Sequence, residues 1–172
     1  MMDMLLVPLM VYAACGLVLS LIVHILSFFG IALGGGTLFT ALHLGIFPLW
    51  IPVVLIGRKM AGGGQRRSDF WKAALSGCPA WMKYMTYFFL AYAVLNFLWF
   101  TGHAKDRHDD VIAHGFSGHW MAFYAAGLAV LTTAHRYGLS NLQRTCPFGH
   151  DVGWTDRFCP TCGASVAPQN PV

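Results

Sequence analysis

Long uncharged runs of apolar residues, separated by short polar segments, dominate this chain. Four of them have about the 20 residues that a helix needs to cross a hydrocarbon core of roughly 30 Å, and they cover residues 4–29, 37–56, 84–102 and 116–134. None shows the period-two alternation of polar and apolar residues that marks a strand of a transmembrane barrel. The pattern predicts an all-α fold, a four-helix transmembrane bundle, over residues 1–140.

The composition supports a membrane protein. Hydrophobic residues make up 56% of the 172 residues and charged residues only 10%, whereas about a quarter of a soluble domain is charged. So few charges cannot cover a water-facing globule, and so apolar a chain cannot stay disordered. The first apolar run has no basic residue before it and is too long for the core of a signal peptide, so we expect a retained helix.

Basic residues predict the orientation, because short loops rich in Lys and Arg stay on the cytoplasmic side. Segment 57–83 carries six of the eleven Lys and Arg residues against one acid, Asp69, whereas segment 103–115 carries two against three aspartates. We therefore expect a multi-pass protein of a bacterial plasma (inner) membrane, with both termini in the cytoplasm. The basic segment either forms a short interfacial helix capped by Ser68 or only enforces the topology.

The C-terminal segment, residues 141–172, carries four residues with metal-ligand spacing. Cys146 and His150 are four residues apart, and after eight further residues come Cys159 and Cys162, the latter followed by Gly163. Tetrahedral zinc takes such thiolate and imidazole ligands from two tight turns. A cytoplasmic disulfide is disfavoured because the compartment is reducing. We expect a structural zinc ion, on which so small a module depends for folding.

This segment resembles the zinc-ribbon family over about residues 144–167. Members of that family pair two knuckles of the type Cys-Pro-x-Cys-Gly, and the second knuckle often follows an aromatic residue, as Cys159 follows Phe158 here. In the first knuckle the family usually has a second cysteine, where this chain has Gly149 and then His150. The resemblance implies a small C-terminal zinc ribbon with a Cys3His ligand set.

Four protein ligands leave a zinc ion no open position for a substrate, so the ribbon is expected to be a rigid binding surface. Its few basic residues, Arg144 and Arg157, are balanced by Asp151 and Asp156, which argues against nucleic acid. We expect it to dock a protein partner or a second copy of the chain. Trp154 either makes that contact or packs over the knuckles.

Histidines gather toward the predicted outer face. Six of eight are at or near it: His24, His43, His103, His108, His114 and His119. His24 and His43 lie at a similar depth on two predicted spans, and ionisable side chains inside a membrane are functional candidates by default. Three interpretations stay open. The first is a site for a second transition metal, or a proton path, made by His24, His43, His119, Asp109 and Asp110; the second is haem b between His24 and His43; the third is purely structural histidines.

Ser117 and Asn96 are polar residues within the predicted spans. Ser117 lies in a Gly-x-Ser-Gly sequence, residues 115–118, which is similar to the nucleophile motif of intramembrane rhomboid proteases over these four residues only. No histidine base follows Ser117 at a suitable place along the chain, although His24 or His43 could supply one. Asn96 is expected to make an interhelical hydrogen bond. The sequence thus favours a non-catalytic membrane protein whose ribbon docks a partner, with a haem b electron carrier as the alternative.

Overall fold

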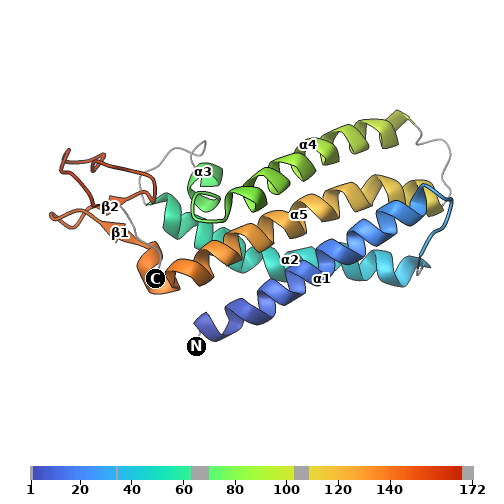
Figure 1. The fold of residues 1–172 in the computed structure, drawn as a ribbon, viewed down its shortest axis with the longest axis horizontal. Helices are drawn as coiled ribbons and strands as arrows, with labels where there is room; N and C mark the ends of the chain where they lie inside the picture. Colours follow the sequence, from blue (N-terminus) through green and yellow to red (C-terminus); the bar gives the residue numbers. More distant parts are fainter. Residues whose placement is uncertain (1, 34, 63–69, 103–108, 168–172) are drawn as a thin grey trace.

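The structure is a computed structural model that describes residues 2–33, 35–62, 70–102 and 109–167. These residues are mostly helical, and a small two-stranded antiparallel sheet follows the helices (Figure 1). The elements in chain order are α1 (Met2–Ser27), α2 (Gly35–Ala61), α3 (Phe70–Ala74), α4 (Ala80–Gly102), α5 (Asp109–Tyr137), the 3-10 helix η2 (Leu139–Leu142), β1 (Arg144–Thr145) and β2 (Asp151–Val152).

Three of the described helices are long and apolar enough to cross a membrane. The qualifying segments are Leu5–Ser27, Gly36–Ala61 and Ala80–Gly102, and they contain most of the first three predicted spans. Few of the residues in their most apolar stretches are buried (28%, 33% and 17%), as expected of helices that face lipid. The structure thus supports a membrane protein with at least these three candidate spans.

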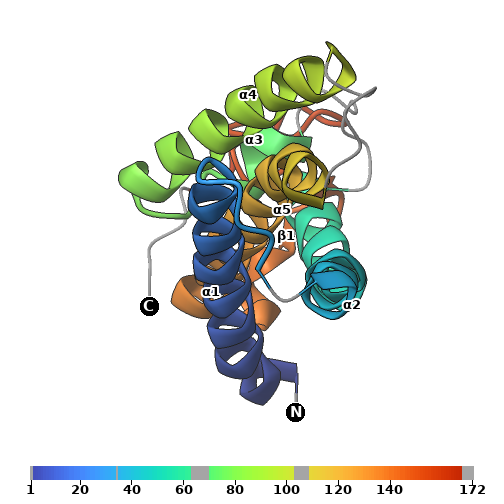
Figure 2. The same cartoon turned by 90° about the vertical axis from the view of Figure 1, so that its right-hand side faces the viewer.

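Helix α5 contains the fourth predicted span, 116–134, and differs from the other three long helices. It is less apolar than they are, and it occupies the centre of the bundle, in contact with α1, α2 and α4 (Figure 2). Most of its residues are buried. Because α5 faces protein on nearly all sides, its sequence is rich in small residues that let other helices approach, and poorer in the large apolar residues that face lipid.

Close packing around α5 depends on glycines. A Cβ atom at Gly118 would lie 2.5 Å from Nδ2 of Asn96, and one at Gly127 would lie 2.8 Å from the Leu49 side chain. The Asn96 amide, brought this close, donates to the carbonyl oxygens of His114 (2.7 Å) and Gly115 (3.1 Å). The predicted interhelical hydrogen bond of Asn96 is confirmed.

The start of α5 corrects one expectation. The sequence pattern predicts a loop over residues 103–115, before the fourth span, but the helix begins at Asp109 and includes Asp110 and His114. Two aspartates in the first turn favour this earlier start, because they interact well with the positive end of the helix dipole. His103 and His108 lie outside the described residues.

The two ends of the bundle carry different groups. The β1–β2 sheet, α3 and the start of α1 lie at one end, and the connection from α1 to α2 lies at the other (Figure 1). Of the two alternatives for the basic segment, a short helix is present as α3, in which Ala73 and Ala74 are buried and Trp71 is 41% exposed. Its expected cap, Ser68, lies outside the described residues, together with Asp69.

Candidate metal centre

The first knuckle is the tight turn between β1 and β2. Gly149 has a φ of +81°, a left-handed conformation that favours glycine. The turn is closed by two backbone hydrogen bonds, from the N–H of Gly149 to the Cys146 carbonyl (2.9 Å) and from the N–H of Cys146 to the His150 carbonyl (3.0 Å). The knuckle therefore brings Cys146 and His150 to the same side of the hairpin.

The second knuckle repeats this geometry. Gly163 has a φ of +73°, its N–H donates to the Cys159 carbonyl (2.9 Å), and the N–H of Cys159 donates to the Ala164 carbonyl (2.8 Å). A β-bridge between Phe158 and Ser165 closes the base of the turn. Cys159 and Cys162 consequently face the first knuckle.

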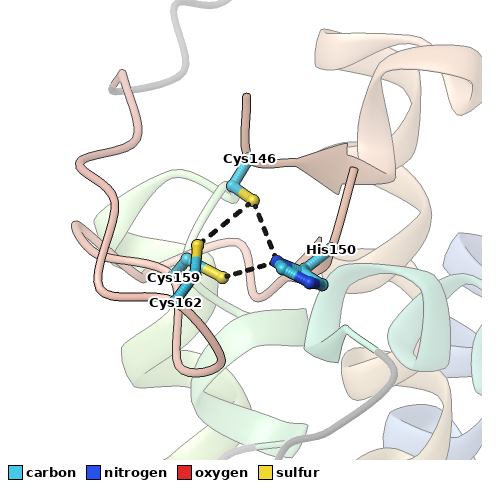
Figure 3. Close-up of side chains that lie close together, drawn as sticks. All are labelled: Cys146, His150, Cys159 and Cys162. Carbon is cyan, nitrogen blue, oxygen red and sulfur yellow. Dashed lines mark hydrogen bonds between the residues drawn. The ribbon is translucent and has the colours of Figure 1, made fainter. Parts of the chain in front are cut away.

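The four predicted ligands converge (Figure 3). One ligand atom from each of Cys146, His150, Cys159 and Cys162 lies within 4.8 Å of the other three. The Sγ atoms of Cys146 and Cys162 are 3.7 Å apart, and Nδ1 of His150 is 3.5 Å from Sγ of Cys146 and 3.9 Å from Sγ of Cys159. Tetrahedral zinc, with Zn–S bonds of about 2.3 Å and Zn–N bonds of about 2.0 Å, separates two sulfurs by about 3.8 Å and sulfur from nitrogen by about 3.5 Å. These side chains can hold a metal ion.

The cysteines of this cluster are free thiols, and a sulfur separation of 3.7 Å is far longer than the bond of about 2.05 Å in a disulfide. Burial raises the pKa of the Cys159 thiol, but hydrogen bonds from the backbone N–H groups of Cys162 and Thr161 outweigh it and lower this pKa to about 6. Because the thiolate is the form that binds metal, Cys159 is ready to act as a ligand at neutral pH.

Trp154 anchors the module on the helices. It is only 8% exposed and belongs to the main core of the bundle, not to the small core around Cys146, Val152 and Cys159. Its ring lies edge-on to that of Tyr137, with 4.9 Å between the centroids, and its backbone N–H donates to the Met60 carbonyl (2.7 Å). Neither sequence-based interpretation of Trp154 is correct, since it packs against the ends of α2 and α5.

Arg144 is a structural residue, although the sequence shows it only as one of the few basic residues of the module. It is 5% exposed, and its guanidinium donates to the carbonyl oxygens of Gly153 (3.1 Å), Trp154 (2.7 Å) and Ala167 (2.5 Å). Burial lowers the pKa of Arg144, and the neighbouring Asp156 opposes that shift. The side chain fixes the loop that carries Trp154, and no motif in the sequence signalled this role.

The histidines of the bundle form two separate groups, and His24 belongs to the first. It is 5% exposed. Its Nδ1 lies 2.8 Å from Oγ of Ser117, and its Nε2 is hydrogen-bonded to the hydroxyl of Tyr92. Both ring nitrogens therefore have partners, and ligation of a metal or haem iron by His24 requires one of these bonds to break.

His114, which was not among the predicted site residues, completes this group. Its ring stacks on that of His24 with 4.5 Å between the centroids. The hydroxyl of Ser27 donates to the His24 carbonyl, so the 2.9 Å contact between Ser27 Oγ and His114 Nδ1 has the imidazole as donor. The helical spacing of His114 and Ser117 on α5 is the signal that could have placed both beside α1.

His43 and His119 lie on another side of α5. His43 accepts a hydrogen bond from the Trp120 indole (3.3 Å), and Nδ1 of His119 lies 3.3 Å from the Gly115 carbonyl of its own helix. Asp109 and Asp110 line two different cavities. Among the described residues, the Cys146 cluster is the group of three or more His, Cys, Asp or Glu side chains whose ligand atoms converge, so the outer metal site stays a prediction.

His24 is close enough to Ser117 to act as the histidine base of a serine nucleophile, although no suitable histidine follows Ser117 in the sequence. Ser117 is completely buried, however, and its hydroxyl is also placed to donate to the His114 carbonyl (3.0 Å). A substrate bond reaches this hydroxyl only if the helices separate. The arrangement fits a structural hydrogen bond better than a nucleophile.

Comparisons with known proteins add no family. No protein-family model matches this chain, and no curated protein or solved structure matches it. The resemblance to zinc ribbons therefore rests on the two knuckles and their four ligands. Function has to be inferred from the geometry of the chain itself.

Proposed function

We propose that this chain is a non-catalytic four-span membrane protein whose C-terminal module binds zinc and docks a protein partner at the cytoplasmic face. The observation that carries the proposal is the spacing of the Cys146, His150, Cys159 and Cys162 ligand atoms, which matches that of tetrahedral zinc. Zinc suits three thiolates and an imidazole better than Mg²⁺ or Ca²⁺, which prefer oxygen. All four ligands come from the protein, so the ion has a structural role.

The arrangement of the helices supports α5 as the fourth span. At 29 residues and 1.5 Å per residue it is about 43 Å long, and it packs along α1 and α4, two of the apolar helices. An even number of spans also brings the start of α1 and the module to one end, where both lie (Figure 1). The basic residues Arg58 and Lys59, at the end of α2, favour the cytoplasm for that end.

Two aromatic residues of the module are exposed. Trp154 holds one side against Met60 and Tyr137, whereas Phe148 in the first knuckle is 71% exposed and Phe158 beside the second is 65% exposed. Exposed aromatic residues on a rigid support are typical of the centres of protein interfaces. We propose that Phe148 and Phe158 contact the partner, either a cytosolic or membrane protein or a second copy of this chain.

Site-specific photocrosslinking in native membranes tests this surface. A photoreactive amino acid at position 148 or 158 of the full-length protein should crosslink to one defined protein, and crosslinking should disappear in the Cys159→Ser background, which loses the zinc site. The same group at Thr155, an exposed residue of the module near the docked Trp154, is the matched control. Equal products from all three positions, or none from 148 and 158, would contradict the proposal.

A haem b electron carrier ligated by His24 and His43 is the competing proposal. It requires His24 to give up Tyr92 or Ser117 as a partner, and His24 and His43 to approach each other past α5. The absorbance spectrum of the purified protein separates the two proposals. A Soret band that disappears in both His24→Ala and His43→Ala would favour the carrier.

A further inference from the structure

A cavity of about 220 Å³ lies between α2, α3, α4 and α5. His119 lines it, whereas His24, His43 and His114 do not. Its lining is apolar, with large aromatic side chains from several helices. The residues that define its walls are Trp50, Trp71, Tyr87, Leu90, Val94 and Phe123. No Lys, Arg, Asp or Glu is among the described residues that line it, so a charged ligand would find no counter-ion there.

One polar atom at this cavity has no partner. Nε1 of Trp50 is the buried side-chain nitrogen or oxygen without a hydrogen bond in the described part of the chain. The other polar side chains at the cavity are engaged: the Thr86 hydroxyl donates to the Met82 carbonyl (2.9 Å), and Nδ1 of His119 bonds to Gly115. Because a buried unsatisfied donor is costly and uncommon, this N–H calls for an acceptor. The nitrogen itself is buried, so a ligand in the cavity can supply that acceptor only when the indole turns toward it.

The cavity opens toward the lipid-facing surface of α4. Leu90 and Val94 line it and are each 56% exposed, and both belong to a candidate membrane span. Trp71 and Tyr87, also at the cavity, are 41% exposed. A molecule dissolved in the bilayer can therefore enter from the side, without passing through water.

These observations restrict the chemistry of the ligand. The indole N–H is a donor only, so the ligand must offer an acceptor. The lining is uncharged, so that acceptor is neutral, and the aromatic walls of Trp50, Trp71 and Phe123 suit a flat ring better than a flexible acyl chain. We propose that this cavity binds a lipid-soluble ring with a carbonyl oxygen, of the quinone class, and that the carbonyl accepts a hydrogen bond from Trp50.

The test uses full-length protein in nanodiscs and a short-chain 1,4-benzoquinone as the probe. Equilibrium dialysis against nanodiscs with and without the protein separates specific binding from partition into lipid. Trp50→Phe keeps an aromatic ring but removes the N–H, and should raise the Kd roughly 3- to 10-fold, the effect of one hydrogen bond. Trp81→Phe, at a tryptophan that is 63% exposed and does not line the cavity, is the matched control and should leave the Kd unchanged.

A second variant keeps the proposal testable if Trp50→Phe fails to fold. Val94→Trp enlarges an exposed side chain at the mouth of the cavity, and should reduce quinone binding to the level of empty nanodiscs while zinc content stays at the wild-type value. Binding of the probe that neither variant changes would overturn the proposal. So would displacement of the quinone by a short-chain diacyl phospholipid at lower concentration, because the ester carbonyl of a lipid would then be the preferred acceptor.

Discussion

Histidine has two different environments in this molecule, one in the C-terminal module and one in the bundle. His150 is held by a turn whose hydrogen bonds and left-handed glycine place its Nδ1 beside the sulfur of Cys146. His24 is held by side chains of two other helices, Tyr92 of α4 and Ser117 of α5. The first imidazole faces ligands for a metal, whereas the second is fully used by hydrogen bonds.

These two environments show under which conditions the spacing of residues in the sequence predicts that their side chains lie close together. Residues on one tight turn are close because of local geometry, so the spacing of Cys146 and His150 is sufficient. Residues at equal depth on two helices meet only if both helices present those faces to each other. Here His24 contacts Ser117 on one side of α5 and His43 contacts Trp120 on another, so a shared depth did not bring them together.

Removal of zinc should give the largest effect and the sharpest contrast between the two regions. The module has a small core of its own, so chelation should unfold residues 144–167 and leave the helices intact. Limited proteolysis with a metal-content assay checks this, and Cys159→Ser should reproduce it. Cys15→Ser, at an exposed cysteine of α1, should change neither readout. A module that stays protease-resistant without metal would refute the metal's structural role.

Replacement of Trp154 by Ala should separate docking from metal binding. Loss of a buried tryptophan typically costs about 3–5 kcal/mol, and here the loss falls on the packing against Tyr137, whereas the backbone hydrogen bond to the Met60 carbonyl can stay. We expect faster proteolysis around Gly138 with one zinc still bound per chain. Phe148→Ala, at an exposed position of the same module, should leave the cleavage rate at the wild-type level. Loss of zinc in Trp154→Ala would show that docking and metal binding are one unit.

Substitution of the bundle histidines should destabilise the helices to different degrees. His24→Ala leaves both Ser117 and Tyr92 without this partner, at about 1–3 kcal/mol for each buried group that stays unsatisfied, whereas His43→Ala affects the Trp120 indole alone. Thermal unfolding in detergent should therefore show the larger decrease in Tm for His24→Ala. His135→Ala, at an exposed histidine, is the control. Equal Tm values for the three variants would show that His24 does not stabilise the bundle.

Labelling of Ser117 by a fluorophosphonate should give the smallest effect, namely none. The hydroxyl is completely buried, and Nδ1 of His24 and the His114 carbonyl both lie within hydrogen-bond distance of it. Mass spectrometry of the peptide that contains Ser117, with and without the reagent, checks this in the folded protein. A modified peptide that disappears in His24→Ala would instead identify a nucleophile activated by its histidine.

The sequence predicted the parts of this protein that depend on local patterns. Uncharged runs predicted the three apolar helices, because length and hydropathy suffice for a membrane span. The spacing of Cys146, His150, Cys159 and Cys162 predicted the cluster, because each pair lies on one turn. The sequence misplaced the start of α5, since the polar residues Asp109, Asp110 and His114 resemble a loop until their place at the end of a central helix is known.

Tertiary structure alone decided which faces of the helices meet and what the module contacts. Trp154 holds the module to α2 and α5 by its hydrogen bond to the Met60 carbonyl and its ring contact with Tyr137. Arg144 fixes the loop that carries Trp154 through carbonyls of the module itself, and backbone carbonyls carry no sequence signal. The unpartnered Trp50 at an apolar cavity is likewise invisible in the chain, because four separate helices form that space. The spacing of residues along the chain determines which side chains one tight turn brings together. Contacts between helices also depend on how each helix is rotated about its axis, and a uniformly apolar sequence does not determine that rotation.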